Sequence, residues 1–153
     1  MAVVSLRVPG RIEYRELAIR AIAVACKVET ESARTLDGRQ REELANQLVS
    51  AIGEAFNNAV LHAYAGRVPG EVEIVATFDT ERIVVDVVDF GSSFAPDQVP
   101  TPDLGTLPTS GMGFFIIRSF VDRLEYLPGR PNILRLTKIL LRERPSSKLS
   151  SGR

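Results

Sequence analysis

A helical run between residues 41 and 64 carries polar side chains on one stripe of an otherwise apolar surface. Glu54, Asn58 and His62 recur at i, i+4 and i+8, and four residues of an α-helix advance by only about 40° past a full turn. The three therefore share one side, beside residues that belong in a core: Leu48, Ile52, Ala55, Ala59, Val60 and Ala63. A carboxylate and an amide in such surroundings must be hydrogen-bonded or bind an ion. This helix is where a functional site is expected.

The composition excludes several classes of protein. Hydrophobic residues make up 44% of the 153 residues and charged residues 25%, which is typical of a single folded domain. Nineteen basic residues balance nineteen acidic ones, so no charge excess indicates binding to nucleic acid or anionic membrane. No run approaches the roughly 20 apolar residues that span a bilayer, and no signal-peptide pattern is present. We therefore expect a cytoplasmic protein, with its one cysteine, Cys26, as a buried small hydrophobe and no zinc site.

Two hydrophobic periods alternate along the chain and predict its elements. Alternation of apolar and polar residues predicts strands at residues 2–8, 71–78, 83–89, 124–127 and 133–140. Helical spacing predicts helices at residues 13–27, 41–64 and 114–121. In the first helix the spacing predicts a buried face made of Leu17, Ala21, Val24 and Val28. The order predicts an α+β fold, a two-layer α/β sandwich whose mixed, mostly antiparallel sheet carries the helices on one face.

Asp89 is a charged residue on the apolar side of its predicted strand. Ile83, Val85 and Val87 share one side of the strand, and Asp89 continues the same parity. A carboxylate therefore stands where an inward apolar residue is expected. Residues 90–112 then break every period, and loops of this length are usually functional and often form lids.

Helical spacing returns at Gly111-Met112-Gly113-Phe114. The first turn of a helix has backbone N–H groups without helical partners, and the helix dipole adds positive potential there. Glycines at this point allow an anion such as phosphate to approach the backbone. The chain has no Walker A lysine motif, which excludes the P-loop class as the source of phosphate binding.

These separate segments together resemble the N, G1 and G2 boxes of the GHKL nucleotide-binding superfamily, whose Bergerat fold occurs in the ATP domains of gyrase and histidine kinases. The boxes correspond to Glu54 with Asn58, to Asp89-Phe90-Gly91, and to Gly111-Met112-Gly113. The amino-acid sequence in and around these boxes is most similar to that of bacterial anti-sigma factor serine kinases. The similar segments are Glu54-Ala55-Phe56-Asn57-Asn58-Ala59, His62-Ala63-Tyr64 and Ser110-Gly111-Met112-Gly113-Phe114. The resemblance runs from residue 3 to residue 141.

The resemblance implies an ATP site with Mg²⁺. Asn58 would hold the metal, and Glu54 would be the catalytic base or water orienter. Asp89 would read the amino group of adenine, while Gly91 lets the base approach the backbone. The remaining contacts to the cofactor would come from His62, Gly111, Met112, Gly113 and Phe114. Amide oxygen suits Mg²⁺, and a carboxylate that accepts a hydroxyl proton suits phosphoryl transfer. From the residues alone, His62 can approach the phosphates or hydrogen-bond within the core.

Two positions depart from the family pattern. Ser93 stands where the G1 box has its second glycine, which predicts a stiffer lid hinge. Pro131-Asn132 stands where the last strand often begins with Gly-Thr, so a nucleotide contact from that strand is in question.

The function implied by the resemblance is that of an ATP-dependent protein serine kinase and anti-sigma factor. Such a protein sequesters a sigma factor of RNA polymerase and phosphorylates a serine of an anti-anti-sigma (STAS-domain) partner. A homodimer is implied as well, with Arg15, Glu16 and Arg20 of the first helix on a partner surface. Two alternatives are the ATP-binding catalytic domain of a two-component sensor histidine kinase and a nucleotide-gated binding module without transfer activity. We expect one ATP-binding domain at residues 1–144 and a disordered tail at 145–153.

Overall fold

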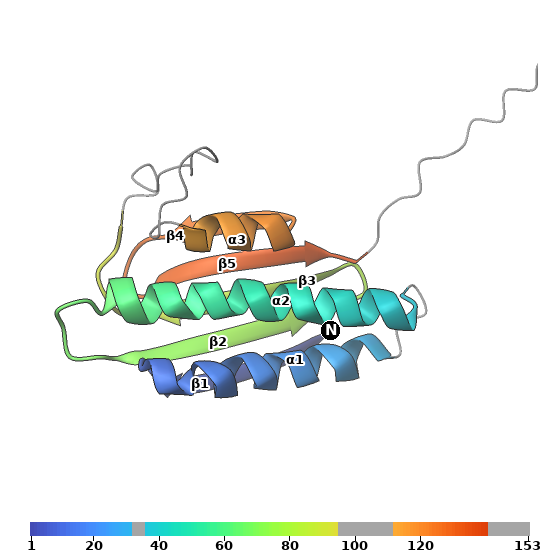
Figure 1. The fold of residues 1–153 in the computed structure, drawn as a ribbon, viewed down its shortest axis with the longest axis horizontal. Helices are drawn as coiled ribbons and strands as arrows, with labels where there is room; N and C mark the ends of the chain where they lie inside the picture. The colour runs from blue at the N-terminus through green and yellow to red at the C-terminus, as the bar shows by residue number, and fades with distance from the viewer. Residues whose placement is uncertain (32–35, 95–111, 141–153) are drawn as a thin grey trace, which may run out of the picture.

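The computed structural model describes residues 1–31, 36–94 and 112–140; the expected tail and most of the expected lid lie outside these residues. Five strands form one sheet in the order β1-β2-β3-β5-β4, with every pair antiparallel. Three helices lie across one face of this sheet (Figure 1). The elements are β1 (Ala2–Pro9), η1 (Ile12–Tyr14), α1 (Arg15–Glu31), α2 (Gly38–Asn58), η2 (Ala59–Ala63), β2 (Glu71–Phe78), β3 (Arg82–Asp89), α3 (Met112–Phe120), β4 (Arg123–Leu127) and β5 (Asn132–Ile139). The predicted two-layer α+β fold is confirmed, with a sheet that is antiparallel throughout the described residues rather than mixed.

The predicted alternation of β2 and β3 decides which side of the sheet meets the helices. The even-numbered residues of β2 and the odd-numbered residues of β3 are buried. These side chains form the core with the inner faces of the helices. Asp89 ends the buried row of β3 with only 8% of its surface exposed, so its predicted inward parity is confirmed. No helix of the described residues is long and apolar enough to cross a membrane.

Helix α2 lies between α1 and α3 on the helical face of the sheet (Figure 1), and it begins with a capping box. Asp37 Oδ1 accepts the Gln40 N–H, and the Gln40 side chain accepts the Asp37 N–H, both at 2.8 Å. The helix therefore starts at Gly38, three residues earlier than predicted. It also does not continue regularly to Tyr64, because the segment Ala59–Ala63 forms a π turn. The Tyr64 N–H donates to Ala59 O at 3.3 Å, the i→i−5 bond of that wider turn.

The predicted buried face of α1 is wrong. Leu17, Val24 and Val28 are 54–61% exposed, whereas the buried positions are Ala18, Ile19, Ile22, Cys26 and Thr30. Helix α1 has apolar residues on two stripes, and packing against α2 and the sheet buries only one of them. Cys26 is buried as expected, and this burial raises the pKa of its thiol to about 11.

Tyr64 joins three elements at the end of the π turn. Its hydroxyl donates to Glu71 O at 2.7 Å and accepts the Phe90 N–H at 3.0 Å. Its ring packs against Gly10 and Gly70, where an added Cβ would lie within 3.0 Å of ring atoms or the hydroxyl. The start of β2, the exit of β3 and the end of η2 are thereby held together next to Asp89.

Candidate nucleotide site

The last turn of α2 and the first turn of α3 meet at Gly113. A Cβ built on Gly113 would lie 3.2 Å from Glu54 Oε2 and 3.4 Å from Asn58 Oδ1. The first separation is tighter than ordinary van der Waals contact and the second is at its lower limit, so the absence of a side chain at Gly113 allows α3 to approach both polar groups. The structure thus brings Glu54, Asn58 and Gly113 together, as the sequence predicted.

Asn58 has an unpaired buried amide. Its Nδ2 is buried and forms no hydrogen bond with any described residue, and the same holds for Asn57 Oδ1. Buried polar groups are nearly always paired, so such an atom in a native fold indicates a partner beyond the described residues, such as a water or a ligand. The Asn58 Oδ1, which is the atom suited to a hard cation, lies on the Gly113 side. No cluster of three or more acidic, histidine or cysteine side chains is found in the described part of the chain. A metal here would therefore depend on Asn58, on waters and on a ligand's phosphates.

The start of α3 has the character of an anion site. Met112 and Gly113 occupy its first turn, where backbone N–H groups lack helical acceptors. Phe114 points its ring toward Phe94, with the ring centroids 5.4 Å apart at 73°. Gly111, the first glycine of this predicted segment, lies outside the described residues.

Asp89 lies at the other end of the site. Its Oδ1 accepts the Gly91 N–H and a hydrogen of Asn132 Nδ2, both at 2.9 Å. Its Oδ2 forms no hydrogen bond with a described residue, which leaves one carboxylate oxygen available to a donor on a ligand. Gly91 packs against η2: a Cβ there would lie 2.7 Å from Ala63 Cβ and overlap the Ala63 carbonyl. The structure therefore gives this glycine a packing reason that the sequence did not reveal.

A small cavity connects the two ends of the site. It has a volume of about 20 Å³ and is lined by Ala55, Asn58, Ala59, Ala63, Val87, Asp89, Ser92, Phe94, Tyr126 and Leu134. This is about the space of one water molecule, so a purine requires one wall to move. The Phe94 ring stacks on the Tyr126 ring, with the centroids 3.9 Å apart and an angle of 12° between the ring planes. The backbone N–H of Phe94 donates to the Tyr126 hydroxyl at 3.2 Å. Ser92 and Phe94 are the lining residues that belong to neither a helix nor a strand, which makes their segment the part of the wall most able to move.

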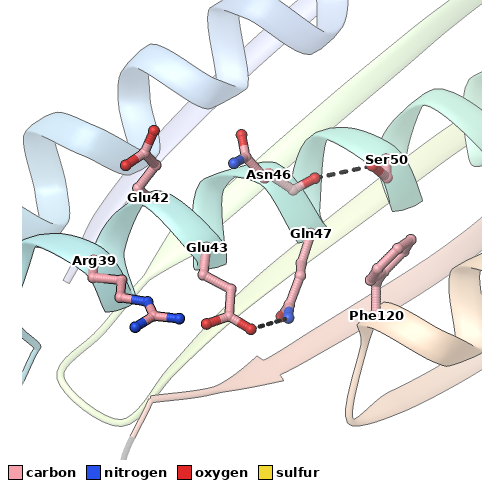
Figure 2. A pocket seen from close by; sticks show the side chains of 7 residues that line it. All are labelled: Arg39, Glu42, Glu43, Asn46, Gln47, Ser50 and Phe120. Atoms are coloured by element: carbon pink, nitrogen blue, oxygen red, sulfur yellow. Dashed lines mark hydrogen bonds between the residues drawn. The ribbon is translucent and has the colours of Figure 1, made fainter.

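A larger hollow of about 470 Å³ lies elsewhere, between the first half of α2 and the end of α3 (Figure 2). Polar and charged side chains dominate its lining, and two of its contacts are internal to α2: Gln47 to Glu43 at 3.2 Å and Ser50 to Asn46 O at 3.0 Å. None of the described residues predicted for the site lines it. We place the site at the smaller cavity because Asn58, with its unpaired amide, and the buried carboxylate of Asp89 both line it.

His62 is separated from the other members of the predicted stripe. His62 lies within the π turn Ala59–Ala63, and its imidazole is exposed without a hydrogen bond to a described residue. Glu54 and Asn58, by contrast, are half-buried and lie together at Gly113. A contact between His62 and a phosphate stays a prediction.

Asn132 and Tyr126 belong to the site although the sequence did not assign them to it. Asn132 is fully buried at the start of β5, directly opposite Asp89. The sequence contained a signal for Asn132. This residue alternates with Leu134 and Leu136 on the buried side of β5, just as Asp89 continues the buried row of β3. Tyr126 of β4 lies opposite Leu134 of β5, next to the same buried row of side chains.

Comparison with known proteins gives the family. An anti-sigma F factor of Caldanaerobacter subterraneus subsp. tengcongensis is 31% identical over 109 residues, which cover 67% of this chain and 75% of that protein. An anti-sigma F factor of Bacillus thuringiensis is 31% identical over 105 residues, or 65% of this chain and 71% of that protein. The histidine kinase domain of the Erythrobacter litoralis EL346 blue-light activated histidine kinase has the same fold, with a TM-score of 0.54 at 24% identity. That match covers 82% of this chain and 61% of the other. A model of the histidine kinase-like ATPase domain matches residues 16–138, and the chain therefore belongs to this family of ATP-binding GHKL domains.

Proposed function

We propose that this protein is an ATP-dependent protein serine kinase that acts as an anti-sigma factor. The observation that carries the proposal is the contact of Glu54 and Asn58 with the start of α3 at Gly113. A carboxylate that would act as general base, an amide oxygen and a helix N-terminus that would bind an anion lie there within one small region. The 31% identity to anti-sigma F factors supports the finer assignment. The partners would be a sigma factor of RNA polymerase and an anti-anti-sigma protein.

Each side chain has a role that follows from its position. Asp89 would accept the exocyclic amine of adenine through Oδ2. The backbone N–H groups of Gly111, Met112, Gly113 and Phe114 would bind phosphate oxygens at the start of α3. Asn58 Oδ1 would hold Mg²⁺, which when bound neutralises charge on the phosphates.

Glu54 would supply the proton acceptor for transfer. The serine oxygen of the partner forms a bond to the γ-phosphorus, and the bond from that phosphorus to the bridging oxygen of ADP breaks. Glu54 takes the proton of the serine hydroxyl as the new bond forms. ADP leaves with the electron pair of the broken bond, so the step balances without a further reactant.

The test is incubation of the protein with labelled ATP and a cognate anti-anti-sigma protein. Acid-stable phosphate on a serine of that partner is expected, and Glu54→Gln should remove it while ATP binding is retained. Glu43→Gln is the matched control, because Glu43 lies on the same helix but is exposed and pairs only with Gln47 among the described residues. ATP binding without any serine phosphate refutes the kinase assignment.

Two other functions give different results in the same experiment. Acid-labile phosphate on a partner favours the catalytic domain of a sensor histidine kinase, to which the fold is similar. A nucleotide-gated binding module shows no transfer at all, and Glu54→Ala then leaves partner binding intact.

The surface of α1 is the proposed place for a protein partner, including a second copy of the chain. Leu17, Val24 and Val28 leave an apolar stripe exposed there, and exposed apolar surface of this kind marks interaction sites. Glu16 and Arg20 pair with each other on this helix at 2.6 Å. Arg15 instead turns toward α2 and donates to Gly53 O at 3.4 Å, so it belongs to the helix packing.

A further inference from the structure

Asn132 is the centre of a closed hydrogen-bond network around Asp89. Its Nδ2 donates to Asp89 Oδ1 at 2.9 Å and to Gly91 O at 3.2 Å. Its Oδ1 accepts the Ser93 hydroxyl at 2.6 Å and the Gly129 N–H at 3.0 Å. The side chain of Asn132 therefore uses both of its donor hydrogens and both acceptor positions of its oxygen.

The orientation of this amide follows from its partners. The Gly129 N–H can only donate and the Gly91 carbonyl can only accept. The oxygen of Asn132 must therefore face Gly129 and its nitrogen must face Gly91, which directs a donor at Asp89. Asn132 is fully buried, so water does not compete for these bonds.

The network fixes the orientation of the Asp89 carboxylate. Rotation of a carboxylate about its last torsion is broad and nearly two-fold, so one hydrogen bond from Gly91 does not distinguish its two oxygens. A second donor on the same oxygen, from Asn132, holds Oδ1 and leaves Oδ2 as the acceptor without a described partner. Asp89 also forms no ion pair within the described ranges, so these N–H groups are its stabilising contacts.

Ser93 and Asn132 are two of the positions at which the sequence departs from the family pattern, and a hydrogen bond of 2.6 Å joins them. We propose that Asn132, braced by Ser93, is a positioning residue that fixes the Asp89 carboxylate and so sets the preference for adenine over guanine. The inference rests on the nucleotide-binding part of the proposed function and requires no phosphoryl transfer. Adenine presents an amine at the position where guanine presents an oxygen, so a fixed carboxylate oxygen attracts the first and repels the second.

The experiment measures equilibrium dissociation constants by calorimetry for the Mg²⁺ complexes of three triphosphates. These are ATP, GTP and the triphosphate of purine riboside, which lacks the exocyclic amine. Asn132→Ala should lower the preference for ATP over GTP by roughly tenfold or more, the effect of losing a charge-assisted hydrogen bond. Its affinity for the purine riboside triphosphate should equal that of the wild-type protein. Ser93→Ala should shift the preference in the same direction by about two- to threefold, because it removes one of the four bonds of Asn132.

Two controls separate positioning from a general loss of structure. Thr30→Val removes another buried hydrogen bond, from Thr30 Oγ1 to Cys26 O on α1, and should leave the preference unchanged. In an Asp89→Asn background, Asn132→Ala should cause no further change in the preference, because its effect passes through Asp89.

The outcomes distinguish the inference from the function on which it rests. A wild-type protein that binds none of the triphosphates refutes nucleotide binding itself. A wild-type preference for ATP that survives both Asn132→Ala and Ser93→Ala overturns only the positioning role. If Asn132→Ala does not fold, the Ser93→Ala result decides, and an unchanged preference there overturns the inference.

Discussion

Replacing Gly91 with alanine would place a methyl group against the backbone of η2. The new Cβ would lie 2.7 Å from Ala63 Cβ and overlap the carbonyl carbon and oxygen of Ala63, whereas carbon atoms in contact are about 3.5–4.0 Å apart. The neighbour is backbone, so no rotamer change relieves the overlap. The loop must move away from η2, which breaks the hydrogen bond from the Ser92 N–H to Ala63 O at 2.8 Å.

The cost follows from these two effects. Overpacking of a close contact costs about 1–3 kcal/mol and a lost hydrogen bond about 1 kcal/mol, so Gly91→Ala should destabilise the fold by about 2–4 kcal/mol. For a chain of this length each kcal/mol lowers the melting temperature by about 2–4 °C, which gives a decrease of roughly 4–16 °C. Thermal melting followed by circular dichroism, together with urea unfolding, measures both quantities.

Gly38→Ala is the matched control for this substitution. Gly38 is the first residue of α2, and no heavy atom of the described residues lies within 4 Å of a Cβ built there. Alanine at such a position stabilises by up to about 1 kcal/mol, because it restricts the unfolded chain and favours the helix. The two variants should therefore shift in opposite directions. Equal melting temperatures for both would refute the packing argument for Gly91.

Tyr64→Phe should destabilise the fold by about 1–3 kcal/mol in urea unfolding, because the Glu71 carbonyl and the Phe90 N–H both lose their partner. Tyr14→Phe, whose hydroxyl has no hydrogen bond among the described residues, should change stability by less than about 0.5 kcal/mol; equal losses for both would contradict the role of Tyr64. Cys26 gives a pH dependence: burial raises the pKa of its thiol from 9.0 to about 11. Its contribution to stability is therefore full below pH 9 and decreases as pH rises to about 11, since the unfolded chain ionises first. Cys26→Ala should lack this decrease, and parallel stability–pH curves for the two proteins would refute it.

Much of the fold was predictable because its determinants are local. The alternation in β2 and β3 is a period of two residues, and it placed both the buried rows and the inward carboxylate of Asp89 without reference to any distant residue. The common direction of Glu54 and Asn58 was equally predictable from the sequence, because one turn of an α-helix separates them. Resemblance then connected these residues with the start of α3, where Gly113 contacts both.

The remaining features depend on contacts that no local period contains. Helix α1 carries two apolar stripes, and its packing against α2 and the sheet decided that Ile19 and Ile22 are buried while Val24 is exposed. The π turn at Ala59–Ala63 was not predicted, because a change in hydrogen-bond spacing leaves no mark on hydrophobic periodicity.

The sequence by itself thus determined which residues lie on a common face of one element, since side-chain direction follows from backbone geometry alone. Tertiary structure decided which groups from different elements share a hydrogen bond. Ser93 and Asn132 lie 39 positions apart in the sequence, and each departs from the family pattern. The pairing of β3 with β5 brings Ser93 Oγ within 2.6 Å of Asn132 Oδ1. That pairing also places Asn132 opposite Asp89, and the orientation of the proposed base-reading carboxylate follows from it.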